Sequence, residues 1–301
     1  MRPRTLLAAS LALSAAALTP GVGGAQPRRP GPAAQAARPL TLREAVQRLQ
    51  SGNADEISDA VDALTRIGTA EVIPPLVELI HSGLPDDLLE RVVTKLGIIA
   101  RPESIDELSA LMHHRRSSVR QRTVEALAHI RDPRVRGLIE SGLRDSDAGV
   151  RSESARALAT INARPSVELL MRAFERNVPE AAESIGALGD AAAADRLLEA
   201  VGHHPLGVLL PGFRRFLDRR DITDPVKLRI VEQLVSRSPT RQVKEFLQEW
   251  VRSLPARDRS RSRARAEIAI RQIRDDATAP PPTPTPPAEA PPAQGANGGG
   301  A

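Results

Sequence analysis

The stretch RSSVRQRTVEALAHI at residues 116–130 is followed 31 residues later by DAGVRSESARALATI at residues 147–161. Valine, arginine, alanine, leucine and isoleucine hold the same places in both copies, and the apolar ones recur at steps of three and four residues. This is the period of one face of an α-helix. Each copy therefore predicts an amphipathic helix, and the repetition predicts an architecture built from one unit used several times.

The repeat extends through five units. Its first anchor recurs at Leu64, Leu96, Leu127, Leu158 and Ile185, with spacings of 32, 31, 31 and 27 residues. A second apolar anchor follows each first one, at Ile73, Ile105, Val135, Val167 and Ala194. Because the two anchors recur with nearly the same spacings through five units, they predict a pair of helices in each unit. Because neither helix can bury its apolar stripe alone, neighbouring units are expected to stack.

The two best copies resemble the HEAT-like repeat family, in its short bacterial PBS-lyase form. The match rests on residues 118–130 and on Asp147-Ala148-Gly149-Val150-Arg151 with the Ala157-Leu158 and Ile161 that follow. The resemblance covers residues 54–202 and implies an all-α fold, an α-solenoid of stacked antiparallel helix pairs. It also implies that Val150 packs inward. Arg120 and Arg151 would then connect adjacent units by bonds to acidic or carbonyl groups.

Residues 1–25 read as a secretory signal. Arg2 and Arg4 precede an uncharged, mainly apolar run at residues 6–18, and small residues at 23–25 suit a signal peptidase. We expect cleavage after Ala25 and a periplasmic or secreted protein. The run is shorter than the ~20 residues of a membrane span, and an uncleaved anchor is the alternative. Residues 26–39 are predicted to be a flexible linker.

The solenoid is predicted to span residues 40–275. At its start, Thr41 and Glu44 fit a capping box, in which hydroxyl and carboxylate satisfy backbone amides of the first turn. Residues 205–275 are predicted to form C-terminal capping helices, the first of them kinked or interrupted at Pro211-Gly212. Four of the five aromatic residues lie in this segment. They indicate a larger closing core or, as the alternative, a pocket for a partner segment centred on Trp250.

The last predicted helix, over residues 257–274, has an arginine at every second position through Arg265. Ala264, Ile268, Ile270 and Ile273 are then the residues expected on its inner face. The arginines are expected to be solvated, with a basic arm for an anionic envelope surface as the alternative. The proline-rich residues 276–301 are predicted to be a disordered tail.

The sequence contains few motifs that indicate catalysis or metal binding. The 301-residue chain has no cysteine, so a thiolate metal site is excluded. It lacks a phosphate-binding loop, a nucleophile elbow and a metal-binding helix signature. His81, His113 and His203 fall at helix ends, where the helix dipole gives a sufficient reason for them. We therefore expect no metal, no cofactor and no enzymatic activity. The net charge of +5 is too small to indicate nucleic-acid binding.

The remaining function is binding of a protein or peptide. The second helices of successive units are expected to line a concave face, on which equivalent helical positions carry Glu78, Arg136, Glu140, Arg172 and Glu199. Their alternating sign suits a polar protein partner. The sequence thus predicts an exported binding scaffold in the cell envelope, with no transmembrane span after signal cleavage. A structural envelope component held by its basic last helix and tail, or a HEAT-like enzyme, are the alternatives, and the oligomeric state stays open.

Overall fold

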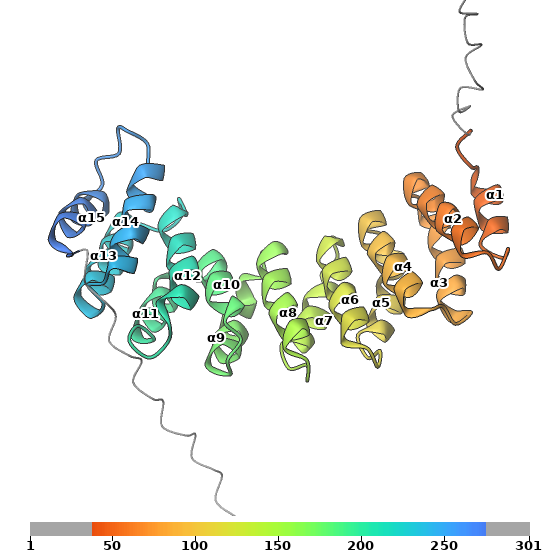
Figure 1. The fold of residues 1–301 in the computed structure, drawn as a ribbon, viewed down its shortest axis with the longest axis horizontal. Coiled ribbons are helices and arrows are strands. Elements are labelled where there is room, and N and C mark those ends of the chain that lie inside the picture. The colour runs from red at the N-terminus through yellow and green to blue at the C-terminus, as the bar shows by residue number, and fades with distance from the viewer. Residues whose placement is uncertain (1–37, 275–301) are drawn as a thin grey trace, which may run out of the picture. The chain divides into compact units, whose positions relative to one another are not determined.

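A computed structural model describes residues 38–274, so the predicted signal, nearly all of the linker and the proline-rich tail lie outside the described residues. The described part contains fifteen α-helices and three short 3-10 helices and no strand (Figure 1). The predicted all-α solenoid is confirmed. The elements are α1 (Leu42–Arg48), α2 (Ala54–Ile67), η1 (Ala70–Val72), α3 (Ile73–His81), α4 (Asp86–Ile99), η2 (Pro102–Ser104), α5 (Ile105–Leu111), α6 (Ser117–His129), α7 (Arg134–Gly142), α8 (Ala148–Thr160), η3 (Arg164–Ser166), α9 (Val167–Glu175), α10 (Glu180–Leu188), α11 (Ala191–Glu199), α12 (Leu206–Asp218), α13 (Asp224–Arg237), α14 (Arg241–Ser253) and α15 (Arg261–Gln272).

After α1 the helices form pairs, from α2 with α3 to α14 with α15, and the pairs follow one another in a row (Figure 1). The first helices of neighbouring pairs pack directly on each other from α2 to α12. From α3 to α11, neighbouring second helices contact each other far less, whereas α13 packs on both α11 and α15. The side chains of these second helices are therefore less tightly packed against the next helix pair, and clefts form between neighbouring second helices, as between α7 and α9.

Local sequence sets where the helices begin and end. At α1 the predicted capping box is present, since the Thr41 amide donates to the Glu44 carboxylate at 2.9 Å and the Glu44 amide donates to the Thr41 hydroxyl. The Asp147 carboxylate accepts from the Val150 amide at 3.1 Å and starts α8. Gly68, with φ of 65°, ends α2 in a left-handed conformation that costs glycine little.

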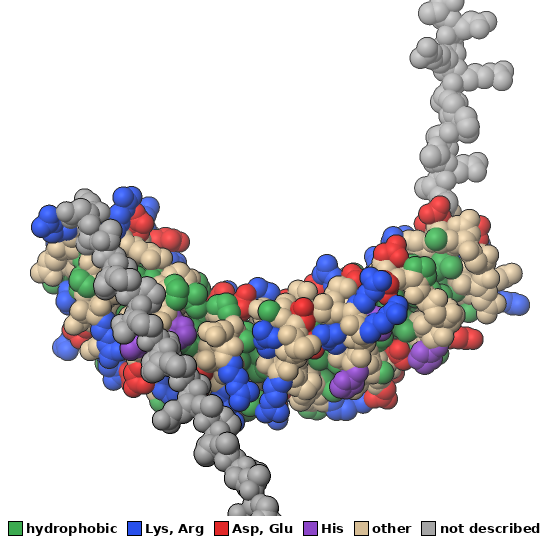
Figure 2. Space-filling view, turned by 60° about the horizontal axis from the view of Figure 1, so that its bottom comes forward, with side chains coloured by type: hydrophobic (Ala, Val, Ile, Leu, Met, Phe, Trp, Pro, Cys, Tyr) green, Lys and Arg blue, Asp and Glu red, His purple; other side chains and the backbone are tan. Residues whose placement is uncertain are grey.

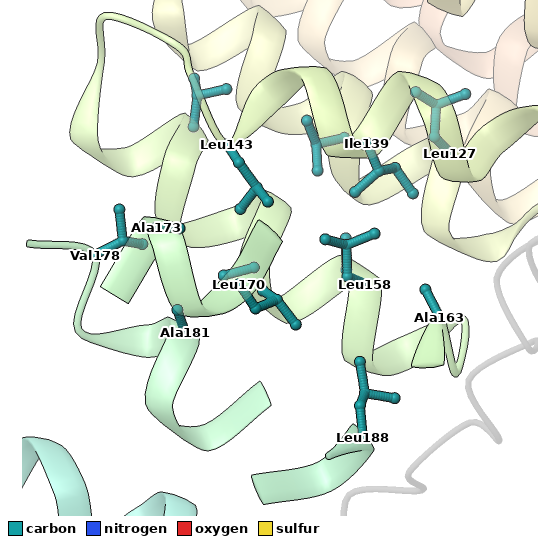
Figure 3. Packing of buried hydrophobic residues seen from close by; sticks show 14 of the residues in the cluster. Leu127, Ile139, Leu143, Leu158, Ala163, Leu170, Ala173, Val178, Ala181 and Leu188 are labelled. Carbon is teal, nitrogen blue, oxygen red and sulfur yellow. The ribbon is translucent and has the colours of Figure 1, made fainter. Parts of the chain in front are cut away.

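The repeat anchors form one continuous apolar core. All five first anchors have no exposed surface, and four of the five second anchors are buried. The exception is Val167, which is half-buried. Figure 3 shows how the side chains of Leu127, Ile139, Leu158 and Leu170, from α6 to α9, gather between the stacked pairs. The register that the sequence predicts is therefore the register of the fold.

Two helices approach each other closely where glycine replaces a side chain. A Cβ added to Gly186 in α10 would overlap the carbonyl oxygen of Gly212 in α12 and lie 2.7 Å from its carbonyl carbon. The same contact lies next to Pro211, at which the sequence predicts a kink or an interruption of the helix. Helix α12 runs without interruption through Pro211 from Leu206 to Asp218, because packing against α10 holds the helix where its own hydrogen bonding is weakened.

The C-terminal helices differ from expectation in two respects. Trp250 is 1% exposed and belongs to the core, so it cannot be the centre of an open aromatic pocket. In α15 the predicted inner face is only partly right. Ile273 is buried, but Ile268 is 43% exposed, and Ala266 and Ala269 face inward instead. The small alanines allow α15 to approach α13 and α14 closely, which bulky isoleucines at these positions would prevent.

Candidate functional site

The five residues predicted for a partner-binding face all lie on second helices. Glu78 is on α3, Arg136 and Glu140 are on α7, Arg172 is on α9 and Glu199 is on α11. Four of them are exposed, and Glu140 is half-buried. None of the five belongs to the buried apolar core.

The structure brings three of these residues together. The Arg136 guanidinium lies 3.6 Å from the Glu140 carboxylate, which also accepts a 2.6 Å hydrogen bond from the Ser166 hydroxyl. Glu140 and Arg172 line one cleft between α7 and α9, with a volume of about 190 Å³. Glu78 lines a separate pocket of about 460 Å³ near α1. Glu199 lies on α11, away from both.

Two further arginines belong to the cleft and were not predicted. Arg144 follows the end of α7, and Arg176 follows the end of α9, 32 residues later, so they hold equivalent places in successive units. We call the site lined by Arg144, Arg172 and Arg176 the arginine cleft. Its floor is apolar and consists of Leu143, Leu169 and Ala173. The recurrence of arginine after two successive second helices is a sequence signal, but cations after a helix are ordinarily explained by the helix dipole.

From α3 to α13, the arginine cleft is the place where no ion pair or histidine–carboxylate contact joins neighbouring second helices of the described chain. His81 of α3 contacts Glu107 of α5 at 2.8 Å, and Asp106 of α5 lies 3.6 Å from Arg134 of α7. Further along, α9 and α11 are joined by Glu168 and Arg196 at 2.6 Å, and α11 and α13 by Asp195 and Arg229 at 2.8 Å. Within residues 38–274, no ion pair joins α7 to α9.

The arginines of the cleft are poorly compensated. Arg144 and Arg176 are exposed, and their side chains make no ion pair or hydrogen bond within the described residues. Arg172 lies 3.6 Å from Glu168, but that carboxylate is held more closely by Arg196. The hydrogen bond from Arg196 is the main reason why the pKa of Glu168 is lowered. The lining of the cleft holds three arginines and one glutamate, Glu140, so the cleft carries a net positive charge.

One face of the molecule carries charges of both signs. Figure 2 shows basic and acidic side chains interspersed over the visible face, without one continuous basic surface. The cleft is thus a local cationic site. Such a site suits recognition of a few carboxylates, whereas duplex nucleic acid requires many phosphate contacts.

The arginines that recur in the repeat motif act inside the array. Arg120 of α6 donates to both carboxylate oxygens of Asp145 at 2.8 and 2.7 Å and to the carbonyl of His114 at 2.8 Å. Arg151 of α8 donates to the carbonyl of Asp145 at 2.8 Å. Val150 is fully buried. These are the roles that the family resemblance implied, and they make Arg120 and Arg151 structural residues.

The histidines have separate environments. His81 contacts Glu107, while the ring of His204 packs against that of Phe174 in a tilted arrangement, with ring centroids 4.6 Å apart. Burial, together with the neighbouring His203, lowers the pKa of His204. Among the described residues, no three His, Asp or Glu side chains are grouped so that they could hold a metal ion. No described helix combines the length and the apolar character needed to cross a membrane.

Two family models match the chain. The model for HEAT repeats matches residues 42–128 and 105–180, and the model for the PBS lyase HEAT-like repeat matches residues 180–203. Together they cover the helices from α1 to α11. A comparison with curated proteins found no match.

Several solved structures are similar to the chain. The complex of CpcE and CpcF of phycocyanin lyase from Nostoc sp. PCC7120 is 15% identical, with 84% of this chain and 100% of that chain covered and a TM-score of 0.43. An engineered protein is 19% identical, with coverages of 76% and 68% and a TM-score of 0.40. A designed armadillo repeat protein is 19% identical, with coverages of 78% and 100% and a TM-score of 0.27.

Proposed function

The chain belongs to the HEAT-like repeat family, and we propose that it is an exported scaffold that binds a partner protein in the cell envelope through the second-helix side of its solenoid. The arginine cleft between α7 and α9 is the observation that carries the proposal. There the arginine side chains lack a close carboxylate partner and lie beside an apolar floor. The other neighbouring second helices from α3 to α13 are joined by ion pairs or, for α3 and α5, by the contact of His81 with Glu107.

The chemistry of the cleft favours binding over catalysis. A guanidinium stays protonated at any physiological pH and presents donors in a planar fork that matches a carboxylate. It therefore recognises anions but does not exchange protons with a substrate. Leu143, Leu169 and Ala173 add apolar surface that a partner side chain would cover. Arginine beside apolar surface is a composition common at the centres of protein interfaces.

Export is the part of the proposal that rests on sequence alone. The charged start, the apolar run at residues 6–18 and the small residues before position 26 support it. An exported scaffold would meet its partner in the periplasm or outside the cell. Signal cleavage would leave the solenoid with its linker and tail.

Cross-linking in cells tests the proposal. The protein is cross-linked in its native envelope, purified, and its partners are identified by mass spectrometry. The wild type is compared with an Arg144→Glu, Arg176→Glu variant. The matched control is Arg66→Glu, since Arg66 is exposed on α2, away from the cleft. Circular dichroism verifies that each variant is folded.

We expect a stoichiometric partner with the wild type and with the Arg66 control, and at least about a tenfold loss with the cleft variant, which corresponds to roughly 1.4 kcal/mol. Equal recovery with the cleft variant would place the interface elsewhere. Recovery of no partner from the wild type above background would refute the scaffold proposal itself.

A further inference from the structure

A second concave feature lies on the turns that join first helices to second helices. A cavity of about 740 Å³ lies between the turns after α6 and α8. A smaller one, of about 300 Å³, lies between the turns after α4 and α6. Both are lined by His129 and Arg131, so they adjoin. We call the two cavities together the turn groove.

The walls of the turn groove repeat with the solenoid. The turns after α4, α6 and α8 each carry a proline, at Pro102, Pro133 and Pro165, spaced by 31 and 32 residues, and the turn after α2 contributes Gly68. Proline has no amide hydrogen, so these positions present apolar rings and carbonyl groups. A surface that repeats in one direction suits a ligand that repeats in the same direction, and an extended polypeptide is such a ligand.

The groove is cationic. Arg131 is exposed, and its side chain makes no ion pair or hydrogen bond within residues 38–274. Arg101 donates through Nε to the Gly68 carbonyl at 3.1 Å, and no carboxylate of the described chain pairs with it. Arg136 completes the set, and the nearest carboxylate oxygen, that of Glu140, lies 3.6 Å away.

The groove has one carboxylate, which is already compensated. Asp132 accepts three hydrogen bonds from Arg134, from its amide at 2.8 Å and from its guanidinium at 3.0 and 3.1 Å. These bonds are the main reason why the pKa of Asp132 is lowered. Asp132 is therefore not free to pair with the open arginines, and the groove keeps its positive charge.

The repeat distance sets the spacing of the ligand's charges. Packed helices lie about 8–10 Å apart, and an extended chain in the polyproline II conformation advances about 3.1 Å per residue with three residues per turn, so every third side chain lies on the same face. Three residues of an extended segment thus span about one helix pair. A carboxylate at every third position would then meet Arg101 and Arg131, which stand on the turns of neighbouring pairs.

We infer that the turn groove binds an extended, acidic protein segment with carboxylates three residues apart. The lining contains no Phe, Tyr or Trp, and His129 is its one aromatic ring, whereas single-stranded nucleic acid is normally held by stacking of successive bases on several aromatic side chains. The chemistry therefore favours a polypeptide. The inference goes beyond the proposed scaffold interface, since the groove lies on the turns and not at the arginine cleft.

Two labelled peptides of identical composition test the spacing. One carries an aspartate at every third position between alanines, and the other has the same aspartates in a single block. Fluorescence anisotropy with the purified full chain measures both affinities. We expect the periodic peptide to bind at least about tenfold more tightly, with an affinity that falls as salt is added.

Variants locate the binding. Arg131→Glu is expected to weaken the periodic peptide by at least about tenfold, while Arg131→Lys retains most of the affinity because it keeps the charge. Within residues 38–274, Arg131 makes no hydrogen bond or ion pair that the substitution would remove. The Arg144→Glu, Arg176→Glu variant is the matched control and should bind the peptide as the wild type does.

The inference would be overturned by equal binding of the blocked peptide, by unchanged binding of the periodic peptide to Arg131→Glu, or by an oligothymidylate that binds as tightly as the periodic peptide. Loss of peptide binding in the cleft variant alone would move the site to the arginine cleft and also overturn the inference, while leaving the scaffold proposal intact. Loss of the cellular partner in the cleft variant alone, with peptide binding kept, supports both proposals.

Discussion

Alanine substitutions at two helical glycines should change stability in opposite directions. Gly137 lies in α7, and an added Cβ would meet nothing within 4 Å. Gly186 lies in α10, where an added Cβ would overlap the backbone of Gly212 in α12. The chemical change is the same at both positions, so the difference isolates the packing of α10 on α12.

The expected magnitudes follow from the two environments. In an open helical position, alanine is more favourable than glycine by about 1 kcal/mol. Overpacking costs about 1–3 kcal/mol, and we expect the upper end at Gly186 because the opposing atoms are backbone and cannot rotate away. Subtracting the helix preference leaves a net loss of about 2 kcal/mol.

Thermal melting followed by helical circular dichroism measures both effects. For a folded region of this size, 1 kcal/mol corresponds to about 2–4 °C. Gly137→Ala should melt about 2–4 °C higher than the wild type and Gly186→Ala about 4–8 °C lower. Urea midpoints should show the same order. A Gly186→Ala protein as stable as the wild type would refute the close approach of α10 and α12.

Three further predictions concern the core, an internal ion pair and the signal. Leu127→Asp should abolish cooperative melting, since Leu127 has no exposed surface and an unpaired buried charge costs several kcal/mol; Ile98→Asp, at a position that is 61% exposed, should melt close to the wild type. Burial tends to raise the pKa of Asp145, but hydrogen bonds from Arg120 and neighbouring groups outweigh it and lower the pKa below its ordinary 3.8. The pair therefore stabilises the fold above the ordinary pKa, and this contribution disappears as the pH falls through the lowered value. Asp145→Asn should reduce the urea midpoint at neutral pH and lose less on acidification than the wild type does, whereas parallel pH profiles would contradict this role. Mass spectrometry of the protein from the envelope should find an N-terminus directly after Ala25, and an intact Met1 there would contradict export by signal cleavage.

Local sequence signals are sufficient for the helices and their register. Helix starts depend on nearby residues, as at Thr41 and Glu44, and helix faces depend on apolar steps of three and four residues. These signals act within one turn or one unit of the chain. For this reason the spacing of apolar residues in the sequence is enough to predict the buried anchors from Leu64 to Ile185.

Tertiary packing decides instead which charged side chains lack an ion-pair partner. Arg172 was predicted on a binding face, but the arginine cleft also needs Arg144 and Arg176 and the absence, among the described helices, of an ion pair between α7 and α9. Arg196, by contrast, is bound to Glu168, 28 residues earlier in the chain. Whether two such side chains meet depends on the rotation and spacing of one helix pair against the next. Those quantities are set by packing at contacts such as Gly186 on Gly212, and no local sequence pattern encodes them.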